Sequence, residues 1–363
     1  MAKRHTAQNQ QQKLGQYFTT NSDAMLEGFE SLVVGKHVID PFAGQKDLLH
    51  WAERNGAASA QGCDLVPQSS DIVCNDSLKN PPDYTGLMVV SNPPYLSRNK
   101  CKHDKSVFAQ WGQNDYYKCH LASLANCDQA IVIVPANFFC ESSARARERL
   151  FETHSITRAK FWTEPAFDDA TVSVAVFHIV KKTKPLQDFS CLILPENTEI
   201  RMTLRRENSY LHGDTFFDYI RNARDIVAVK TDVGMPAPNT NLVVGLLDNG
   251  KWRSGISYNT GEPVYTNPKS FTTYQLTLPE YTLTEAQQQR IAGLFHRRLT
   301  EFRKKYHSMF LSNYMGPNQK ILSRSIVKKL LGSVLDELGI PDPKPPSAFN
   351  RMFRIENLPD STS

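Results

Sequence analysis

Residues 86–95 read Gly-Leu-Met-Val-Val-Ser-Asn-Pro-Pro-Tyr, an apolar run that ends abruptly in an amide, two prolines and an aromatic ring. The apolar run predicts a buried strand, which the prolines must end because each lacks an N–H and fixes φ at about −65°. The backbone is therefore rigid where Asn92 leaves the sheet. The Asn92 amide oxygen and the Pro93 carbonyl can face one planar –NH2 group, and the Tyr95 ring can lie over the same plane. The alternative is a stiff turn in an exposed, proline-rich segment.

Apolar runs on both sides of this stretch alternate with helical patterns, which indicates an α/β fold: a mostly parallel sheet with helices on both faces. The predicted strands are residues 33–40, 58–64, 72–76, 87–91, 130–135, 156–161 and 171–180, and the predicted helices are 47–55, 116–125 and 142–152. Three strands run into an acid, at Asp40, Asp64 and Asp76, and a fourth ends at Asn92. Ligands of such sheets bind beyond the carboxyl ends of the strands, so we expect these four side chains to line one site. Helix capping is the alternative for the acids.

The composition is that of a globular protein, since 22% of the 363 residues are charged and 40% are hydrophobic. No apolar run reaches the length of a membrane span. The polar, Gln-rich residues 1–12 predict a short disordered tail and not a secretory signal. The 7 cysteines are scattered, without a CxxC pair. We interpret them as reduced thiols of a cytoplasmic protein and expect no metal site.

The sequence pattern changes after residue 183. Residues 188–282 are rich in Thr, Asn, Gly, Pro and aromatic residues with short β-like runs, whereas residues 283–338 have a helical period. The stretch 285–338 contains ten Lys and Arg residues but four acidic ones, although the net charge of the whole chain is only +5. Such a basic stretch indicates a polyanion as partner, and a solvated helix face is the alternative. Residues 341–363 predict a Pro-rich tail.

The segment Asp40-Pro41-Phe42-Ala43-Gly44 comes at a predicted strand-to-helix turn. Gly44 permits a tight turn and a close approach of the backbone to a ligand. Asp64 follows Asp40 by 24 residues, at the end of the next strand, where an acid of dinucleotide-binding folds holds ribose hydroxyls. The glycine pattern is not GxGxxG, so we do not expect NAD.

A series of segments in one consistent order resembles the S-adenosylmethionine-dependent DNA adenine-N6 methyltransferases. The segments are Gly15-Gln16-Tyr17-Phe18-Thr19-Thr20, Asp40-Pro41-Phe42-Ala43-Gly44, Asp64, Asp76, Asn92-Pro93-Pro94-Tyr95, Val134-Pro135-Ala136-Asn137-Phe138-Phe139 and Ala166-Phe167-Asp168-Asp169-Ala170-Thr171-Val172-Ser173-Val174. They cover residues 14–180. Their order is similar to that of the group in which the Gly-Gln-Tyr-Phe-Thr segment comes first and a target-recognition domain comes last.

The resemblance implies a Rossmann-like methyltransferase sheet, S-adenosylmethionine as the cofactor, and methyl transfer to the N6 amino group of a flipped adenine in a specific DNA sequence. The implied cofactor residues are Tyr17, Phe18, Thr19, Asp40, Pro41, Phe42, Ala43, Gly44, Asp64 and Asp76. In the family pattern, Asp40 holds the methionine amino group, Asp64 the ribose hydroxyls and Asp76 the amino group of the cofactor adenine. The implied catalytic residues are Asn92, Pro93, Pro94 and Tyr95, and the implied stacking faces for the flipped base are Tyr95 and Phe167. Core packing is the alternative for Tyr17, Phe18 and Phe167.

One position departs from the family pattern, which usually has a second glycine two places after Gly44. This chain has Lys46 there, so we expect a side chain that turns away from the cofactor or one that contacts the cofactor carboxylate. A catalytically weak DNA-binding protein with a methyltransferase fold is therefore one alternative function. An RNA-base or protein-glutamine N-methyltransferase is another, because guanine N2 and a side-chain amide also present a planar –NH2 group. The early Gly-Gln-Tyr-Phe-Thr segment and the long C-terminal half favour DNA.

The predicted domains are a tail at 1–12, a catalytic domain at 13–183, a target-recognition domain of mixed β and helical structure at 188–340, and a tail at 341–363. The expected partner is double-stranded DNA, and the basic residues expected at its backbone are Arg297, Arg298, Arg303, Lys304, Lys305, Lys328 and Lys329. A restriction endonuclease that acts on the same site is a candidate partner, and we expect no membrane partner. The resemblance implies a cytoplasmic enzyme encoded by a bacterium, phage or plasmid.

Overall fold

The computed structural model describes residues 22–102, 104–164, 172–182, 186–248, 253–266 and 272–343. The chain forms two compact units. The first unit contains the chain up to Asp214 together with Arg303–Ile321, and the second contains Thr215–Phe302 together with the chain from Leu322 onward.

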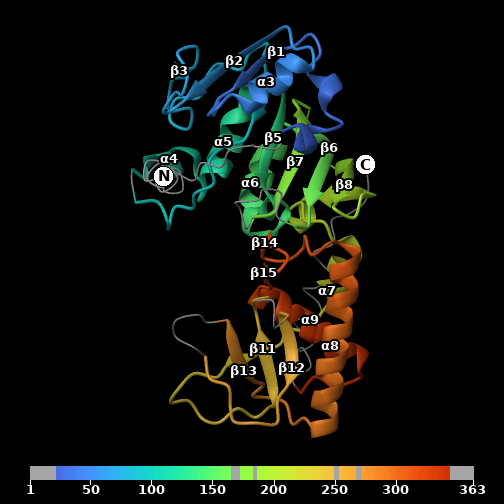
Figure 1. Cartoon of the computed structure of the whole chain (residues 1–363). Coiled ribbons are helices and arrows are strands. Elements are labelled where there is room, and N and C mark those ends of the chain that lie inside the picture. Colours follow the sequence, from blue (N-terminus) through green and yellow to red (C-terminus); the bar gives the residue numbers. More distant parts are fainter. Residues whose placement is uncertain are drawn as a thin grey trace, which may run out of the picture. The chain divides into compact units, whose positions relative to one another are not determined.

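The described part of the first unit is built on a nine-stranded sheet with the order β3-β2-β1-β4-β5-β7-β6-β8-β9 (Figure 1). Its strands are β1 (His37–Asp40), β2 (Ser59–Asp64), β3 (Val73–Cys74), β4 (Met88–Ser91), β5 (Gln129–Pro135), β6 (Ser155–Trp162), β7 (Val174–Val180), β8 (Leu186–Leu194) and β9 (Thr198–Arg205). Strands β1 to β5 pair in parallel, and β7 is antiparallel to both β5 and β6. The predicted α/β class, with a mostly parallel sheet, is confirmed.

Helices cover both faces of this sheet, because successive side chains of a strand point to opposite faces. On β5, Val132 and Val134 pack into a core with α5 and α6, whereas Ile131 and Ile133 pack into a second core with α2 and α3. The helices of this unit are α2 (Ser22–Leu26), α3 (Asp47–Arg54), α4 (Ser106–Trp111), α5 (Tyr116–Ser123) and α6 (Ala144–Phe151), with short 3-10 turns at Glu30–Leu32, Leu124–Asn126, Ala136–Phe139, Glu141–Ser143 and Arg206–Asn208. Burial on both sides explains the continuous apolar sequence of β5.

The sheet continues past residue 183, where the sequence pattern predicted a change of domain. Strand β8 pairs in parallel with β6 and antiparallel with β9. Its residues Phe189, Cys191 and Ile193 are buried, and the residues between them are more exposed. This alternation is typical of a strand near a sheet edge, and it hides the strand among polar residues in the sequence. The compact units therefore divide the chain elsewhere than between 183 and 188.

The second unit combines an antiparallel sheet, in the order β10-β13-β11-β12, with helices. Its strands are β10 (Val229–Lys230), β11 (Leu242–Gly245), β12 (Gly255–Tyr258) and β13 (Thr273–Thr277). Its helices are α7 (Asp214–Arg221), whose first residue belongs to the first unit, α8 (Glu285–Lys305) and α9 (Arg324–Glu337). The last residues of α8, from Arg303 onward, belong to the first unit. No described helix is long and apolar enough to cross a lipid bilayer.

The prediction of helical structure throughout 283–338 is correct for α8 and α9 but wrong between them. A hairpin of β14 (Asn313–Gly316) and β15 (Gln319–Ile321) lies there and belongs to the first unit. The turn residues of Gly-Pro-Asn at 316–318 explain why no helix continues. The hairpin is anchored by backbone hydrogen bonds from Ser173 N to Met315 O at 2.8 Å and by Tyr314 Oη to Thr163 O at 2.9 Å.

Candidate functional site at the carboxyl rim of the sheet

Three of the predicted site residues lie at the carboxyl ends of adjacent parallel strands. Asp64 ends β2, Asp40 ends β1, and Asn92 directly follows β4. Because β2, β1 and β4 are neighbours in the sheet, these side chains lie along one rim. The strand order reverses direction between β1 and β4, and doubly wound sheets bind ligands at such a switch point.

Backbone N–H groups hold the two acids of this rim. Asp40 Oδ1 accepts from Phe42 N, and Asp64 Oδ2 accepts from Gly44 N, both at 2.9 Å. Asp64 Oδ1 also accepts from Val66 N at 2.8 Å. Gly44 has a φ of 49°, which favours glycine. Each carboxylate oxygen can accept a second hydrogen bond, so Asp64 keeps acceptor capacity for hydroxyl groups.

The loop that carries Phe42 and Gly44 lies directly on β2 because Gly62 has no side chain. A Cβ atom at Gly62 would lie 2.7 Å from Ala43 Cβ and 2.8 Å from Ile72 Cδ1. Ala43 N donates to Cys63 O at 2.8 Å. The main chain of the loop is thus pinned to the neighbouring strand.

The Asp40 carboxyl lies in an environment that disfavours its negative charge. It is 1% exposed, and burial raises its pKa to about 8; the hydrogen bond from Phe42 N opposes this rise, and the charge of Asp64 adds to it. Without a cation beside it, such a carboxyl is largely protonated at pH 7. The site therefore fits a ligand that brings a positive charge to Asp40.

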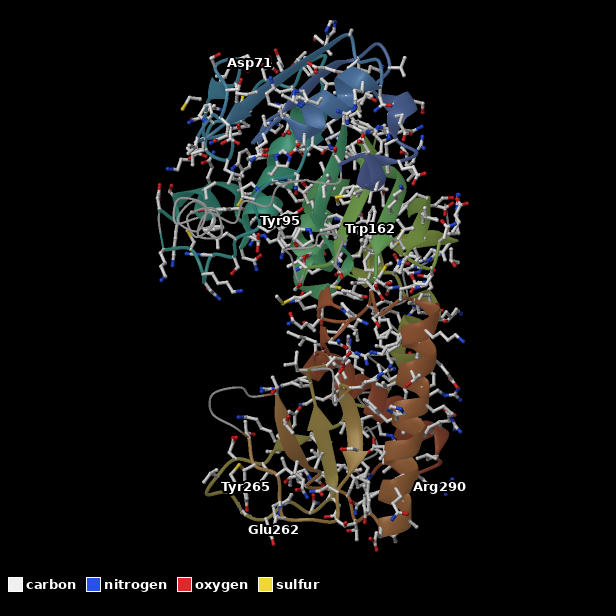
Figure 2. All side chains as sticks on the ribbon, in the orientation of Figure 1. Asp71, Tyr95, Trp162, Glu262, Tyr265 and Arg290 are labelled. Carbon is white, nitrogen blue, oxygen red and sulfur yellow. The ribbon has the colours of Figure 1, made fainter. Side chains whose placement is uncertain are left out.

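Lys46 pairs with Asp71, in the loop between β2 and β3 (Figure 2 labels Asp71). The distance from Lys46 Nζ to Asp71 Oδ2 is 2.7 Å, and this hydrogen bond lowers the pKa of Asp71 to about 2. The Lys46 backbone has φ 69° and ψ 17°, in the left-handed region that favours glycine. A carboxylate of the protein therefore holds this lysine, in a backbone conformation that suits the glycine of the family pattern.

Replacing Lys46 with glycine is expected to raise the melting temperature above that of Lys46→Ala. Both changes remove the ion pair with the exposed Asp71, which contributes little to stability. Only glycine relieves the left-handed backbone, which costs other residues roughly 1–2 kcal/mol. Thermal unfolding of both variants beside the wild type measures the difference, and equal Tm values for the two variants would contradict it.

The Asn-Pro-Pro-Tyr segment folds so that Tyr95 reaches back to Asn92. Tyr95 Oη donates to Asn92 Oδ1 at 2.5 Å and lies 3.1 Å from Ile133 O, a second acceptor. Asn92 is buried, at 9% exposure, whereas Tyr95 is partly exposed beside the central strands (Figure 2). The Tyr95 ring meets the ring of Tyr117 edge-on, with 6.2 Å between centroids and 85° between planes.

His120 is a site residue that sequence reasoning missed. Its Nε2 lies 2.9 Å from Ser91 Oγ, next to Asn92, and its ring meets the Phe42 ring edge-on at 4.9 Å. Burial lowers its pKa to about 3, so the imidazole is neutral. His120 thus connects the Asp40 loop with the end of β4. No local pattern in the sequence reveals contacts with strands so distant in the chain.

Asp76 is less closely tied to the rim than the other acids. It lies two residues beyond Cys74, the last residue of β3, and its side chain is 29% exposed. Its Oδ1 accepts from Lys79 N at 3.3 Å, which caps a turn. The predicted positions Tyr17, Phe18, Thr19 and Phe167 lie outside the described residues.

The basic residues predicted to contact DNA divide between the two units. The first unit contains Arg303, Lys304 and Lys305, and the second contains Arg297, Arg298, Lys328 and Lys329. Arg298 donates to Glu337, with Nε 3.0 Å from Oε2, and to Glu301, with Nη1 2.9 Å from Oε2. Because two carboxylates compensate its charge, Arg298 is poorly suited to a phosphate contact. Lys304, Lys305, Lys328 and Lys329 are exposed.

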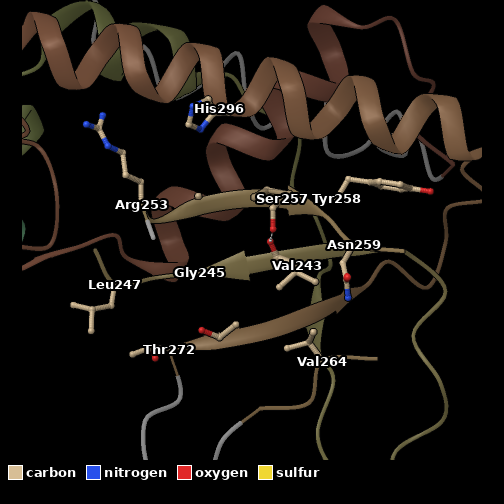
Figure 3. A pocket seen from close by; sticks show the side chains of 13 residues that line it. Val243, Gly245, Leu247, Arg253, Ser257, Tyr258, Asn259, Val264, Thr272 and His296 are labelled. Atoms are coloured by element: carbon tan, nitrogen blue, oxygen red, sulfur yellow. Dashed lines mark hydrogen bonds between the residues drawn. The ribbon is translucent and has the colours of Figure 1, made fainter. Parts of the chain in front are cut away.

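A cavity of about 600 Å³ opens in the second unit at strands β11 and β12 (Figure 3). Its polar lining includes Arg253, Ser257, Asn259, Thr273 and His296. These side chains come from the sheet, the adjoining loops and α8. They offer both hydrogen-bond donors and acceptors, which suits a ligand with polar edges.

No protein-family model and no curated protein matches this chain. Solved structures that it resembles include a modification subunit assigned to a type I restriction enzyme of Vibrio vulnificus YJ016, at 14% identity and a TM-score of 0.42, with 60% of this chain and 55% of that chain covered. Another is a type I restriction-modification methyltransferase subunit from Streptococcus thermophilus, at 17% identity and a TM-score of 0.36, with 51% and 50% covered. This chain spans about half the length of these proteins. Such distant similarities assign no function.

Proposed function

We propose that this chain transfers a methyl group from S-adenosylmethionine to the N6 amino group of an adenine in double-stranded DNA. The observation that carries the proposal is the convergence of Asp40, Asp64 and the segment Asn92–Tyr95 at one rim of a doubly wound sheet. Acids that suit a nucleoside with a cationic group thus lie beside acceptors that suit an amino group.

The residues around Asp40 fit the cofactor. Burial raises the pKa of the Asp40 carboxyl to about 8, so a neighbouring positive charge would stabilise its ionised form. This carboxyl would hold the ammonium group of the cofactor. Asp64 would accept hydrogen bonds from the ribose hydroxyls with its free lone pairs. When bound, S-adenosylmethionine supplies a methyl group that is already activated by its sulfonium.

Asn92 and Pro93 would hold the amino group that receives the methyl. The exocyclic nitrogen of adenine is a poor nucleophile because it shares its lone pair with the ring. If Asn92 Oδ1 and the Pro93 carbonyl accept its two hydrogens, the nitrogen is drawn toward tetrahedral geometry and its lone pair faces the methyl donor. Such positioning can contribute roughly 7–11 kcal/mol. No strong base is needed first, because the proton leaves after transfer.

Adenine inside a stacked duplex cannot reach this rim, so the base must flip out of the helix. The partly exposed ring of Tyr95 is a face on which the flipped base would stack, and such stacking contributes about 1–3 kcal/mol. The exposed lysines support a nucleic-acid partner. The polar side chains in the otherwise mostly apolar lining of the cavity in the second unit would contact base edges.

Incubation of the purified chain with S-adenosylmethionine labelled in its methyl group tests the proposal. Duplex DNA of mixed sequence, structured RNA and a protein extract are offered separately. Label in N6-methyladenine of the DNA is the expected result. If label appears only in RNA or in protein glutamine, the proposed DNA substrate is wrong. If calorimetry detects no binding of S-adenosylmethionine, the proposed methyltransferase activity is refuted.

Reversing the charge of Lys304 and Lys305 to glutamate is expected to weaken duplex binding and to flatten its salt dependence. Each phosphate contact contributes about 0.9 to the slope of log K against log salt, so loss of two contacts lowers the slope by about 2. Fluorescence anisotropy of a labelled duplex between 50 and 200 mM salt, the range in which such contacts are resolved, measures both effects.

The matched control for this pair is the reversal of Lys181 and Lys182, which are also adjacent and exposed. They follow Val180, which pairs with Gln129 at the opposite end of β5 from the Asn92 rim. DNA affinity that falls equally in both pairs would indicate net charge alone, and affinity unchanged at Lys304 and Lys305 would refute their role.

A further inference from the structure

The orientation of the Asn92 side chain decides whether it can hold an amino group. A carboxamide has an oxygen that accepts at one end and an –NH2 group that donates at the other, and the two ends have nearly the same shape. Only the oxygen can accept a hydrogen from an incoming amine. If the carboxamide were rotated by 180°, its –NH2 group would face the hydrogens of the substrate amine, and no hydrogen bond could form. A productive site therefore needs a contact that distinguishes the oxygen end from the –NH2 end.

The hydroxyl of Tyr95 makes such a contact. Its oxygen lies 2.5 Å from Asn92 Oδ1, a distance that belongs to O–H···O hydrogen bonds and is shorter than the usual N–H···O range of about 2.7–3.2 Å. The single hydroxyl proton has two possible acceptors, and the shorter distance, 2.5 Å to Asn92 Oδ1 against 3.1 Å to Ile133 O, favours Asn92. A proton donated to Asn92 selects the oxygen end of the carboxamide. Oδ1 has two lone pairs, so a hydrogen bond from Tyr95 does not by itself use up its capacity to accept.

The surroundings keep the Tyr95 hydroxyl in place. Its ring packs edge-on against Tyr117, which is fully buried and whose hydroxyl donates to Asn137 Oδ1 at 2.8 Å. Ile133 O, at 3.1 Å from the Tyr95 hydroxyl, lies on the central strand β5. The two prolines between Asn92 and Tyr95 restrict the backbone that joins the two side chains.

We propose that the Tyr95 hydroxyl is a positioning group, which holds the Asn92 carboxamide with Oδ1 toward the site of the amine. The proposal rests on the proposed function and adds to it, because the stacking role needs only the ring of Tyr95. Phenylalanine at this position keeps the ring and loses the hydroxyl, so Tyr95→Phe separates the two roles.

In steady-state methylation, Tyr95→Phe is expected to lower kcat about ten-fold, the effect of one lost hydrogen bond. We expect KM for DNA and cofactor to stay within about two-fold. Fluorescence of 2-aminopurine placed at the target base should stay as in the wild type, because the ring still stacks. Tyr95→Leu removes the ring too, so this variant should lose both the activity and the 2-aminopurine signal of the flipped base. The control Tyr84→Phe removes a hydroxyl near the opposite end of β4 and should leave kcat unchanged. A Tyr95→Phe variant with wild-type kcat would overturn the proposal.

A second measurement does not depend on activity. In protein labelled with 13C and 15N at asparagine, the Asn92 side-chain signals are identified by their loss in Asn92→Ala. The Asn92 13Cγ shift is expected to move in Tyr95→Phe and to stay in place in Tyr84→Phe. An unmoved signal in Tyr95→Phe refutes the positioning role even if the chain methylates DNA. If the wild-type chain transfers no methyl to any substrate, the proposed function is refuted. The Asn92 13Cγ shift then still tests the hydrogen bond between Tyr95 and Asn92.

Discussion

Replacement of Asn92 by alanine is expected to lower kcat for methyl transfer at least about 10²–10³-fold, the usual effect of removing one preorganised hydrogen-bonding group from a reaction centre. The reason is the loss of Oδ1 as an acceptor for the amine, which leaves only the Pro93 carbonyl. DNA affinity and cofactor affinity are expected to stay near the wild-type values. Single-turnover transfer of labelled methyl, with gel-shift and calorimetric binding in parallel, measures the three quantities.

Two further variants separate chemistry from folding. Asn92→Asp keeps an acceptor oxygen in a side chain of the same shape and is expected to keep more of the rate than Asn92→Ala. Asn80→Ala changes an exposed asparagine after β3 and is expected to behave as the wild type. Full turnover by Asn92→Ala, or a loss of rate that parallels a loss of folded protein, would sink the proposed mechanism.

Asp40→Asn is expected to weaken cofactor binding about 10- to 100-fold, the range for a hydrogen bond to a charged group. The substitution keeps the shape of the side chain and an oxygen for Phe42 N, but it removes the charge that would face the ammonium group. In the wild type, affinity is expected to rise between pH 6 and pH 8.5, because the Asp40 carboxyl ionises with a pKa of about 8. Calorimetry across this range measures the difference between the two proteins.

The same pKa predicts an opposite effect on stability. The Asp40 pKa in the folded chain is about 8, above its ordinary value of 3.8, so the folded state binds the proton more tightly than the unfolded state. This contribution to stability is fully present below about pH 4 and is lost as pH rises to 8. Asp40→Asn cannot titrate and should therefore unfold at a higher temperature than the wild type at pH 8. The exposed Asp71→Asn is the control, and an equal pH dependence in Asp40→Asn and the wild type would contradict the assignment.

The rim of the sheet could be predicted well because its signals are local. Strands β1 and β4 contain short apolar runs that pass directly into a polar side chain, at Asp40 and Asn92, and β2 likewise ends in an acid, Asp64. Parallel strands joined by helices place their carboxyl ends on one edge, so chain order alone brings these groups together. The strands β8 and β9 were not predicted, because a half-buried strand near an edge alternates with polar residues and lacks a continuous apolar run.

Contacts between distant segments could not be read from the sequence. The hairpin at 313–321 carries turn residues that signal a break in the helix, but its hydrogen bonds with Ser173 and Thr163 join parts far apart in the chain. The contact of His120 with Ser91 and the ion pair of Lys46 with Asp71 are of the same kind. Such pairings depend on how strands and helices pack, which no local period encodes.

The sequence by itself determined the α/β sheet, the order of its polar strand ends and the rigid turn at Asn92, because hydrophobic period and proline geometry act within a few residues. Only the tertiary structure decided how these groups are held. It buried the Asp40 carboxyl, paired Lys46 with Asp71 and brought the Tyr95 hydroxyl to Asn92 Oδ1. Burial and side-chain direction are properties of packed segments, so the charge of Asp40 and the orientation of Asn92 follow from the fold and not from the motifs.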